Sequence, residues 1–196
     1  MQQKPNYHKL YEIAESQAGY FSTSQAREVG FSRERLSSNT KKGVFLRAAR
    51  GVYRLVHFPG SPHEDLFVAW LRTGRKAVIS HKSALSLYDL TDVLPSEIHV
   101  IVPETASRRR DGIRQHTNQL IPSEIARREG LPVTTVSRTI SDVTISGIPE
   151  ELVQQAIQEA LQRGLTSQEE LRNHAERRGG RAKRIIHAIL SEEITR

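Results

Sequence analysis

The 196-residue sequence contains no cysteine, which excludes a disulfide scaffold, a thiol nucleophile and thiolate-bound zinc or iron–sulfur centres. Long hydrophobic runs are also missing, since the longest spans residues 66–71 and a membrane-spanning helix needs roughly 18 residues. The first residues show no apolar segment of the kind found in secretory signals. We therefore expect a cytoplasmic protein with a folded core and no membrane partner.

The common motifs of catalysis and cofactor binding are absent as well. The sequence has no G-x-S-x-G elbow, no G-x-G-x-x-G or Walker loop and no H-E-x-x-H helix. His63, Glu64 and Asp65 come nearest to a metal-ligand cluster, and a polar helix start explains them equally well. His81 fits a capping or structural role better than that of a catalytic base. We expect no enzyme activity, no catalytic residue, no cofactor and no metal.

Positive charge is concentrated in the first quarter of the chain. The whole sequence has a formal net charge of +7, and residues 1–55 hold ten basic and four acidic side chains, a net +6. The other 141 residues are nearly neutral, with 19 basic and 18 acidic side chains. This asymmetry indicates a polyanion-binding module joined to a neutral body. A solvated basic face accounts for the charge equally well, so the pattern of the residues has to decide.

Helix signals in this basic segment predict a helix-turn-helix. Apolar residues at helical spacing predict a first helix near residues 7–16. Ser22 and Gln25 form a capping box for a short second helix that Gly30 ends. Ser32 caps a third helix, and Phe31 before it can pack on the apolar residue at the fourth helical position, Leu36. Two short helices joined by a tight turn with glycine form this motif.

The outward face of the third predicted helix carries cations and small hydroxyls. If Leu36 points inward, a rotation of 100° per residue turns Glu34, Ser38 and Lys41 outward, flanked by Arg35, Ser37 and Lys42. A merely solvated helix would more often mix acids among its cations, and here only Glu34 does so. Such a face suits a helix that lies in the DNA major groove.

A basic hairpin is predicted after Gly43. Arg50 and Gly51 fit a two-residue turn, because glycine readily adopts a positive φ. In that register Arg47 and Arg54 lie directly opposite each other on the outer face, where a DNA phosphate would relieve their repulsion. The residues expected to face the core are Leu46, Ala48, Tyr53 and Leu55. Three helices and a basic hairpin form a winged helix-turn-helix, and its expected DNA-contacting residues are Ser22, Thr23, Arg33, Arg35, Ser37, Ser38, Lys41, Lys42, Arg47, Arg50 and Arg54.

Several segments resemble the AbiEi-type antitoxins. In the basic region the similar segments are residues 19–26, 30–36, 43–47 and 50–53, and further along they are residues 79–88, 99–103 and 130–142. The resemblance covers roughly residues 7–190. It implies an antitoxin that represses a promoter at inverted repeats and opposes an AbiEii-like nucleotidyltransferase toxin encoded next to it.

The predicted fold class is α+β. We expect a winged helix-turn-helix over residues 1–56, a linker over 57–63, and an α/β domain over 64–196 with a small sheet and a helical C-terminal half. The helices predicted in this second domain span residues 64–72, 81–88, 136–143, 149–163, 167–178 and 181–194, with a short helical turn at 124–128 and strands at 98–102 and 112–120. Arg138 and Asp142, four residues apart, are expected to form an ion pair. The loop Arg108–Arg110 fits a solvated loop better than a phosphate or partner contact.

Three functions remain open. The leading interpretation is a DNA-binding antitoxin and autorepressor whose partners are operator DNA and a toxin. The second is a stand-alone winged-helix regulator without a toxin. The third is an enzyme such as a nuclease that is targeted by the winged helix, and the missing cluster of catalytic acids disfavours it.

Overall fold

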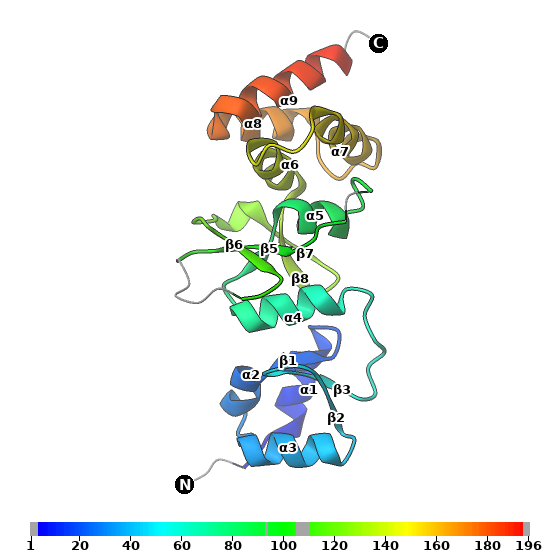
Figure 1. The fold of residues 1–196 in the computed structure, drawn as a ribbon, viewed down its shortest axis with the longest axis vertical. Helices are drawn as coiled ribbons and strands as arrows, with labels where there is room; N and C mark the ends of the chain where they lie inside the picture. The colour runs from blue at the N-terminus through cyan, green and yellow to red at the C-terminus, as the bar shows by residue number, and fades with distance from the viewer. Residues whose placement is uncertain (1–3, 93, 105–109, 194–196) are drawn as a thin grey trace. The chain divides into compact units, whose positions relative to one another are not determined.

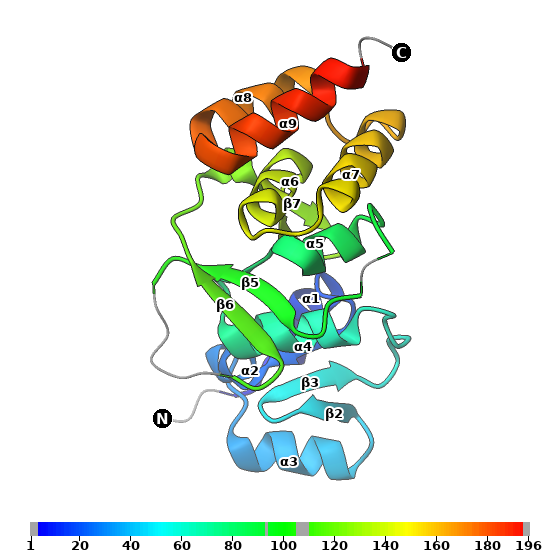
Figure 2. The same ribbon diagram turned by 45° about the horizontal axis from the view of Figure 1, so that its top comes forward.

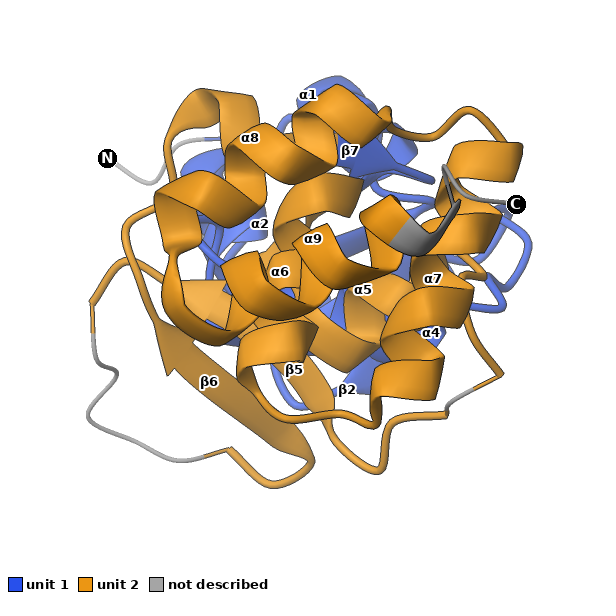
Figure 3. Ribbon diagram, turned by 90° about the horizontal axis from the view of Figure 1, so that it is seen from above, with its two compact units in different colours: residues 1–77, 127–131 blue, residues 78–126, 132–196 orange. Residues whose placement is uncertain are grey.

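The computed structural model describes residues 4–92, 94–104 and 110–193 and divides into two compact units (Figure 3). Unit 1 comprises residues 1–77 and 127–131, and unit 2 comprises residues 78–126 and 132–196. Helix α4 (Glu64–Thr73) belongs to unit 1, although the sequence analysis assigned residues 64–72 to the second domain. The proposed domain boundary at residues 57–63 stays a prediction.

Unit 1 has the topology of a winged helix-turn-helix, as predicted (Figure 1). Its three strands form an antiparallel sheet in the order β1-β3-β2. Besides α4, its elements are α1 (Tyr7–Glu15), β1 (Tyr20–Ser22), α2 (Thr23–Glu28), α3 (Arg33–Lys41), β2 (Phe45–Ala49) and β3 (Val52–Leu55). The sequence analysis did not predict β1, because three residues are too few to show alternation.

Local signals in the sequence set the helix starts of unit 1. The Ser22 hydroxyl accepts a hydrogen bond from the Gln25 backbone N–H at 3.2 Å, and the Gln25 side chain accepts one from the Ser22 N–H at 2.8 Å. The predicted capping box is therefore confirmed. Phe31 and Leu36 are both 1% exposed in one apolar cluster, as the predicted packing across the start of α3 requires.

The wing hairpin has a different register from the predicted one. Ala49 pairs with Val52, so the predicted turn at Arg50 and Gly51 is confirmed, with φ of 82° at Gly51. Beyond it, Ala48 forms a β-bulge that shifts the pairing by one residue. Arg47 therefore lies opposite Tyr53, and Leu46 lies opposite Arg54. The predicted Arg47–Arg54 pair is wrong, because a bulge cannot be read from alternation alone.

The bulge also changes which residues of the hairpin face the core. Phe45 is 1% exposed and packs in the apolar cluster of unit 1, with Tyr53 and Leu55 partly buried against it. Leu46 is 39% exposed, so its predicted inward position is wrong, and Ala48 is only partly buried. The predicted inward positions of Tyr53 and Leu55 are confirmed.

The helices of unit 2 pack beside a five-stranded mixed sheet of order β6-β5-β4-β8-β7, in which residues 127–128 of β7 and residue 131 of β8 are counted with unit 1. Helix α5 lies against β5, α6 packs on α5, and α7, α8 and α9 pack around α6 (Figure 2). The elements are β4 (Val78–Ile79), α5 (His81–Leu87), β5 (Ile98–Val102), β6 (Ile113–Thr117), β7 (Ile125–Arg128), β8 (Leu131–Thr134), α6 (Val136–Ile145), α7 (Glu150–Gln162), α8 (Gln168–Arg178) and α9 (Gly180–Glu193). The predicted α+β class is confirmed.

One element of unit 2 was predicted with the wrong type. The segment 124–128 was expected to be a helical turn, but a 3₁₀ turn at Pro122–Glu124 leads into strand β7. Proline at the first position of the turn favours this start. No helix in the described part of the chain is both long and apolar enough to cross a membrane.

A buried ion network ties α6 to α8 and to the 3₁₀ turn before β7. Arg138 Nε lies 2.8 Å from Asp142 Oδ2, so the predicted pair along α6 is confirmed. Arg138 Nη1 also contacts Glu124 Oε1 at 3.1 Å, and Arg178 Nη2 contacts the other Asp142 oxygen at 3.2 Å. The side chains of Arg138 and Asp142 are 3% and 2% exposed. Each buried charge therefore has an opposite partner, which offsets part of its desolvation cost.

Candidate nucleic-acid interface

The outward face of α3 is built as the sequence predicts. The Ser32 hydroxyl accepts a hydrogen bond from the Arg35 backbone N–H at 3.2 Å and thereby starts the helix. Leu36 and Asn39 are buried, and the Asn39 side chain is held by hydrogen bonds to Tyr7 and to the Arg35 carbonyl oxygen. The exposed residues of the helix and its C-terminal cap are Arg33, Glu34, Arg35, Ser37, Ser38, Lys41 and Lys42.

A shallow groove runs along this exposed face. It has a volume of about 690 Å³, and its lining residues are Arg33, Glu34, Ser37, Ser38, Lys41 and Lys42. The pKa of Glu34 is lowered because its carboxylate accepts hydrogen bonds from its own backbone N–H and from Ser32. The groove is thus lined by one carboxylate and three cations. The hydroxyls of Ser37 and Ser38 in the same lining can donate or accept hydrogen bonds.

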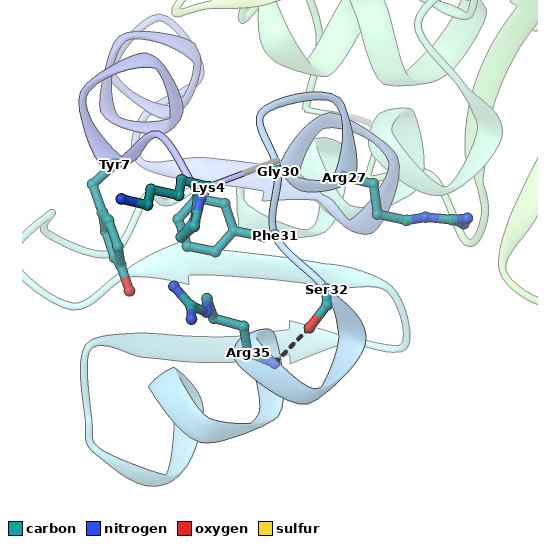
Figure 4. A pocket seen from close by; sticks show the side chains of 8 residues that line it. Lys4, Tyr7, Arg27, Gly30, Phe31, Ser32 and Arg35 are labelled. Carbon is teal, nitrogen blue, oxygen red and sulfur yellow. Dashed lines mark hydrogen bonds between the residues drawn. The ribbon is translucent and has the colours of Figure 1, made fainter. Parts of the chain in front are cut away.

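A second, larger hollow lies at the start of α3 (Figure 4). It has a volume of about 850 Å³ and is lined by Lys4, Pro5, Tyr7, Arg27, Gly30, Phe31, Ser32 and Arg35. Figure 4 shows the Arg35 side chain extending from α3 toward Phe31 and Lys4. No acidic side chain occurs among the described residues that line it. The three cations that line this hollow, Lys4, Arg27 and Arg35, give it a charge that attracts phosphate groups.

Lys4 and Arg27 were missed as candidate site residues. Both were counted in the basic excess of the segment, but neither lies on the third predicted helix or on the hairpin. Lys4 precedes α1, and Arg27 lies in the last turn of α2, next to the turn that leads into α3. A basic residue at the end of the second helix of a helix-turn-helix is the signal that could have identified Arg27.

The tip of the wing carries two exposed cations. Arg47 in β2 and Arg50 in the turn are both exposed. The turn is fastened to α2, because the Thr23 N–H and hydroxyl both donate to the Gly51 carbonyl oxygen, at 2.9 and 3.2 Å. Thr23 and Ser22 thus serve the local structure as a wing tether and a helix cap.

Arg54 is engaged within unit 1. Its Nη1 donates a 2.6 Å hydrogen bond to the Phe58 carbonyl oxygen, and its guanidinium carbon lies 5.8 Å from the centre of the Tyr20 ring. Arg54 is partly buried, whereas Arg47 and Arg50 are exposed. The Arg54 side chain therefore anchors the segment after the wing. One of its N–H donors is already used within unit 1.

The other candidate groups of the sequence form no site around α3. His63 contacts Glu129 at 3.1 Å, Glu64 accepts a 2.6 Å hydrogen bond from the Tyr20 hydroxyl, and Asp65 accepts one from a backbone N–H of α4. Burial, followed by the hydrogen bond to Glu64, raises the pKa of Tyr20. These contacts are those of a polar helix start. Arg108 and Arg109 lie outside the described residues.

The comparison with known families matches the basic region. Residues 8–56 match the family described as "Transcriptional regulator, AbiEi antitoxin". This segment contains α2, α3 and the wing, so the resemblance noted in the sequence is confirmed for it, and the N-terminal region matches a DNA-binding regulator family. None of the curated proteins compared with the chain is significantly similar to it.

One solved structure shares the architecture over most of the chain. It is the crystal structure of the RV2827C protein from Mycobacterium tuberculosis, with a TM-score of 0.54 and 14% sequence identity. The match covers 97% of this chain and 79% of that one. At this level of identity the likeness concerns the fold.

Proposed function

We propose that the chain is an antitoxin-type transcriptional repressor that binds operator inverted repeats through α3 and the wing. In this proposal α3 enters the major groove, where Arg35, Ser37, Ser38 and Lys41 meet base edges. Lys42, Arg47 and Arg50 contact phosphates, and Lys4 and Arg27 join them from the hollow at the start of α3. Arg54 holds the wing in position and contributes no phosphate contact.

The exposed face of α3 is the observation that carries this proposal. Four cations, Arg33, Arg35, Lys41 and Lys42, share it with two serines and a single carboxylate. Helix α3 and strand β2 pack side by side (Figure 2), so the helix and the wing can contact one DNA duplex together. The family matched by residues 8–56 supports the same reading.

A paired variant of the full chain tests DNA binding. Lys41→Ala with Lys42→Ala should weaken retention of the promoter DNA in a gel shift and reduce the slope of log affinity against log salt. The matched control is Arg72→Ala with Lys76→Ala, which removes two exposed cations outside α3 and the wing. Equal losses in the two double variants would show that only net charge matters, and the α3 interface would be rejected.

The antitoxin role is proposed for the rest of the chain. We infer from the family matched by residues 8–56, together with the resemblance of residues 79–88, 99–103 and 130–142 to the AbiEi-type antitoxins, that the chain opposes a nucleotidyltransferase-type toxin. Co-expression of the chain with a nucleotidyltransferase-type toxin from a neighbouring gene should restore growth of cells that this toxin arrests. The Lys41→Ala, Lys42→Ala variant, expressed from an unrelated promoter, should restore growth equally well, because repression and neutralisation are separate in this proposal. Full repression without any growth rescue would indicate a stand-alone regulator.

A further inference from the structure

Three histidines from different elements of unit 2 meet at one point. His81 begins α5, His99 lies in β5 and His116 lies in β6. One ring nitrogen of each lies within 4.8 Å of the other two. His99 Nδ1 is 3.1 Å from His116 Nε2, and the rings of His81 and His116 stack with their centres 3.7 Å apart. The sequence analysis treated His81 alone and did not single out the other two.

The parallel pairing of β5 and β6 brings two of these rings to the same face of the sheet. Ile101 is the register partner of His116, and His99 precedes Ile101 by two residues. Side chains two residues apart in a strand project from one face, so His99 and His116 share it. His99 is 8% exposed and His116 is half-buried on the outermost strand of the sheet.

The start of α5 is fastened so that His81 faces this pair. The Ser80 N–H donates to the His99 carbonyl oxygen at 3.0 Å, and the Ser83 hydroxyl accepts from the His99 N–H at 2.8 Å. His81 is buried, and its backbone has a φ of 50°, in the left-handed region that residues other than glycine rarely adopt. Such a strained buried residue is held by its surroundings and is typical of functional sites.

We propose that His81, His99 and His116 form a binding site for a divalent transition-metal ion, with Zn²⁺ as the best fit. Three neutral imidazoles are a known zinc ligand set that leaves the fourth position open to water. Two nitrogens on one tetrahedral zinc ion lie roughly 3.3 Å apart when the Zn–N bonds are about 2.0–2.1 Å. The 3.1 Å between His99 Nδ1 and His116 Nε2 is close to this value. The nitrogen of His81 lies within 4.8 Å of the other two, and its ring stacks on that of His116, so the half-buried His116 ring must turn before all three nitrogens can point at one ion.

Burial and neighbouring positive charge act on these imidazoles. Burial, followed by the neighbouring histidines and cations, lowers the pKa of His81 to about 2, and burial with His116 and Arg114 lowers the pKa of His99 to about 4. The charged groups that act on the cluster are Lys82, Arg114, Arg138, Asp142 and Arg178.

The cationic neighbours make the site selective for strong imidazole binders. Asp142 is the only acid in that set, and its two oxygens are already bound by Arg138 and Arg178. A hard cation such as Mg²⁺, which prefers oxygen ligands, therefore finds no ligand here. For Zn²⁺, Co²⁺ or Ni²⁺, the free energy of three metal–nitrogen bonds can exceed the repulsion between the ion and the neighbouring cations.

Metal binding to the full chain, freed of metal with a chelator, tests the site. Isothermal titration with Zn²⁺ should give one strong equivalent, and Mg²⁺ should give none. Co²⁺ should develop the visible absorption of a tetrahedral nitrogen site, and the melting temperature should rise with Zn²⁺ concentration. His116→Gln should weaken Zn²⁺ binding by more than the roughly 10–100-fold that loss of an outer-shell partner costs.

The matched control is His57→Gln, because His57 is exposed and lies outside the cluster. It should bind Zn²⁺ as the unmodified chain does. His99→Gln serves as a second ligand variant if circular dichroism shows that it folds, and otherwise His116→Gln decides alone. Absence of a strong equivalent in the unmodified chain would overturn the proposal. So would equal Zn²⁺ affinity in His116→Gln and His57→Gln, since surface histidines would then bind the ion.

Discussion

Arg54 donates a 2.6 Å hydrogen bond from Nη1 to the carbonyl oxygen of Phe58. This bond joins β3, the last strand of the wing, to the segment that follows it. It also gives Arg54 a role different from that of Arg47, although the sequence suggested that the two arginines were equivalent. Arg47 is exposed opposite Tyr53, whereas Arg54 is partly buried beside Tyr20. The two side chains should therefore respond differently to removal.

Arg47→Ala should weaken DNA binding by a similar factor on operator and random DNA. A phosphate contact carries no base information, and its loss should reduce the salt slope by about 0.9 per contact. The free energy of unfolding should change by less than about 0.5 kcal/mol, because the side chain is exposed. Fluorescence anisotropy at several salt concentrations measures the binding, and an unchanged slope would contradict the wing contact.

Arg54→Ala should instead destabilise unit 1. It removes a charge-assisted hydrogen bond to Phe58 and the contact with the Tyr20 ring. We expect a loss of about 1–3 kcal/mol in the free energy of unfolding, measured by urea denaturation. DNA affinity per folded molecule should fall little, and its salt slope should stay as in the unmodified chain. Normal stability combined with a reduced slope would identify Arg54 as a phosphate contact after all.

Arg35→Ala tests base readout by α3. If Arg35 makes a bidentate contact with a base, its loss should cost about 1–3 kcal/mol of discrimination between operator and random DNA. The matched comparison is Lys42→Ala, which should weaken binding to both DNAs equally, because Lys42 at the end of α3 is proposed to contact a phosphate. Competition gel shifts give both affinities. An equal loss on both DNAs in Arg35→Ala would make Arg35 a phosphate contact in the hollow of Figure 4.

Gly19→Ala should be more destabilising than Gly43→Ala. Both glycines have a positive φ, 87° and 72°, so both substitutions carry the left-handed backbone penalty of roughly 1–2 kcal/mol. A Cβ at Gly19 would also lie 2.4 Å from Phe58 Cβ, whereas a Cβ at Gly43 meets nothing within 4 Å. We expect the clash to add about 1–3 kcal/mol. Similar urea midpoints for the two variants would mean that the segment around Phe58 yields freely.

Acid should weaken unit 2 through Glu124. Burial raises the pKa of its carboxyl, but the Ile121 N–H, Arg138 and His174 outweigh burial and lower the pKa below 4.5. A carboxyl with a lowered folded-state pKa stabilises the fold above its unfolded-state pKa, and this contribution is lost as the pH falls through the folded-state value. Glu124→Gln should therefore be less stable at pH 7 and lose less stability on acidification. Parallel acid profiles of the variant and the unmodified chain would contradict this.

The sequence predicted the helices well because their signals are local. Ser22 and Ser32 cap helices in the structure as the sequence pattern predicts. Short strands carried no comparable signal, and β4 with two residues could not be recognised by alternation. The wing register failed for a related reason, since the extra residue at Ala48 depends on how β2 twists against β3.

The candidate interface was predicted on α3 and at the tip of the wing, but not in the hollow at the start of α3. The exposed face of α3 could be derived from 100° steps around the helix, but Lys4 and Arg27 come from other segments and line one hollow with Arg35 only in the folded chain. The histidine cluster shows the same limit more strongly. His81, His99 and His116 are far apart in sequence, and only the parallel pairing of β5 and β6 and the start of α5 bring them together.

The double hydrogen bond from Thr23 to Gly51 has a thermodynamic consequence for DNA recognition. It fixes the wing turn to the first residue of α2 before any DNA is present. The entropy of ordering the wing is therefore spent when the chain folds, and little of it is left to oppose association. In the proposed DNA complex, such a preorganised hairpin would have little freedom to adapt to a poorly fitting site.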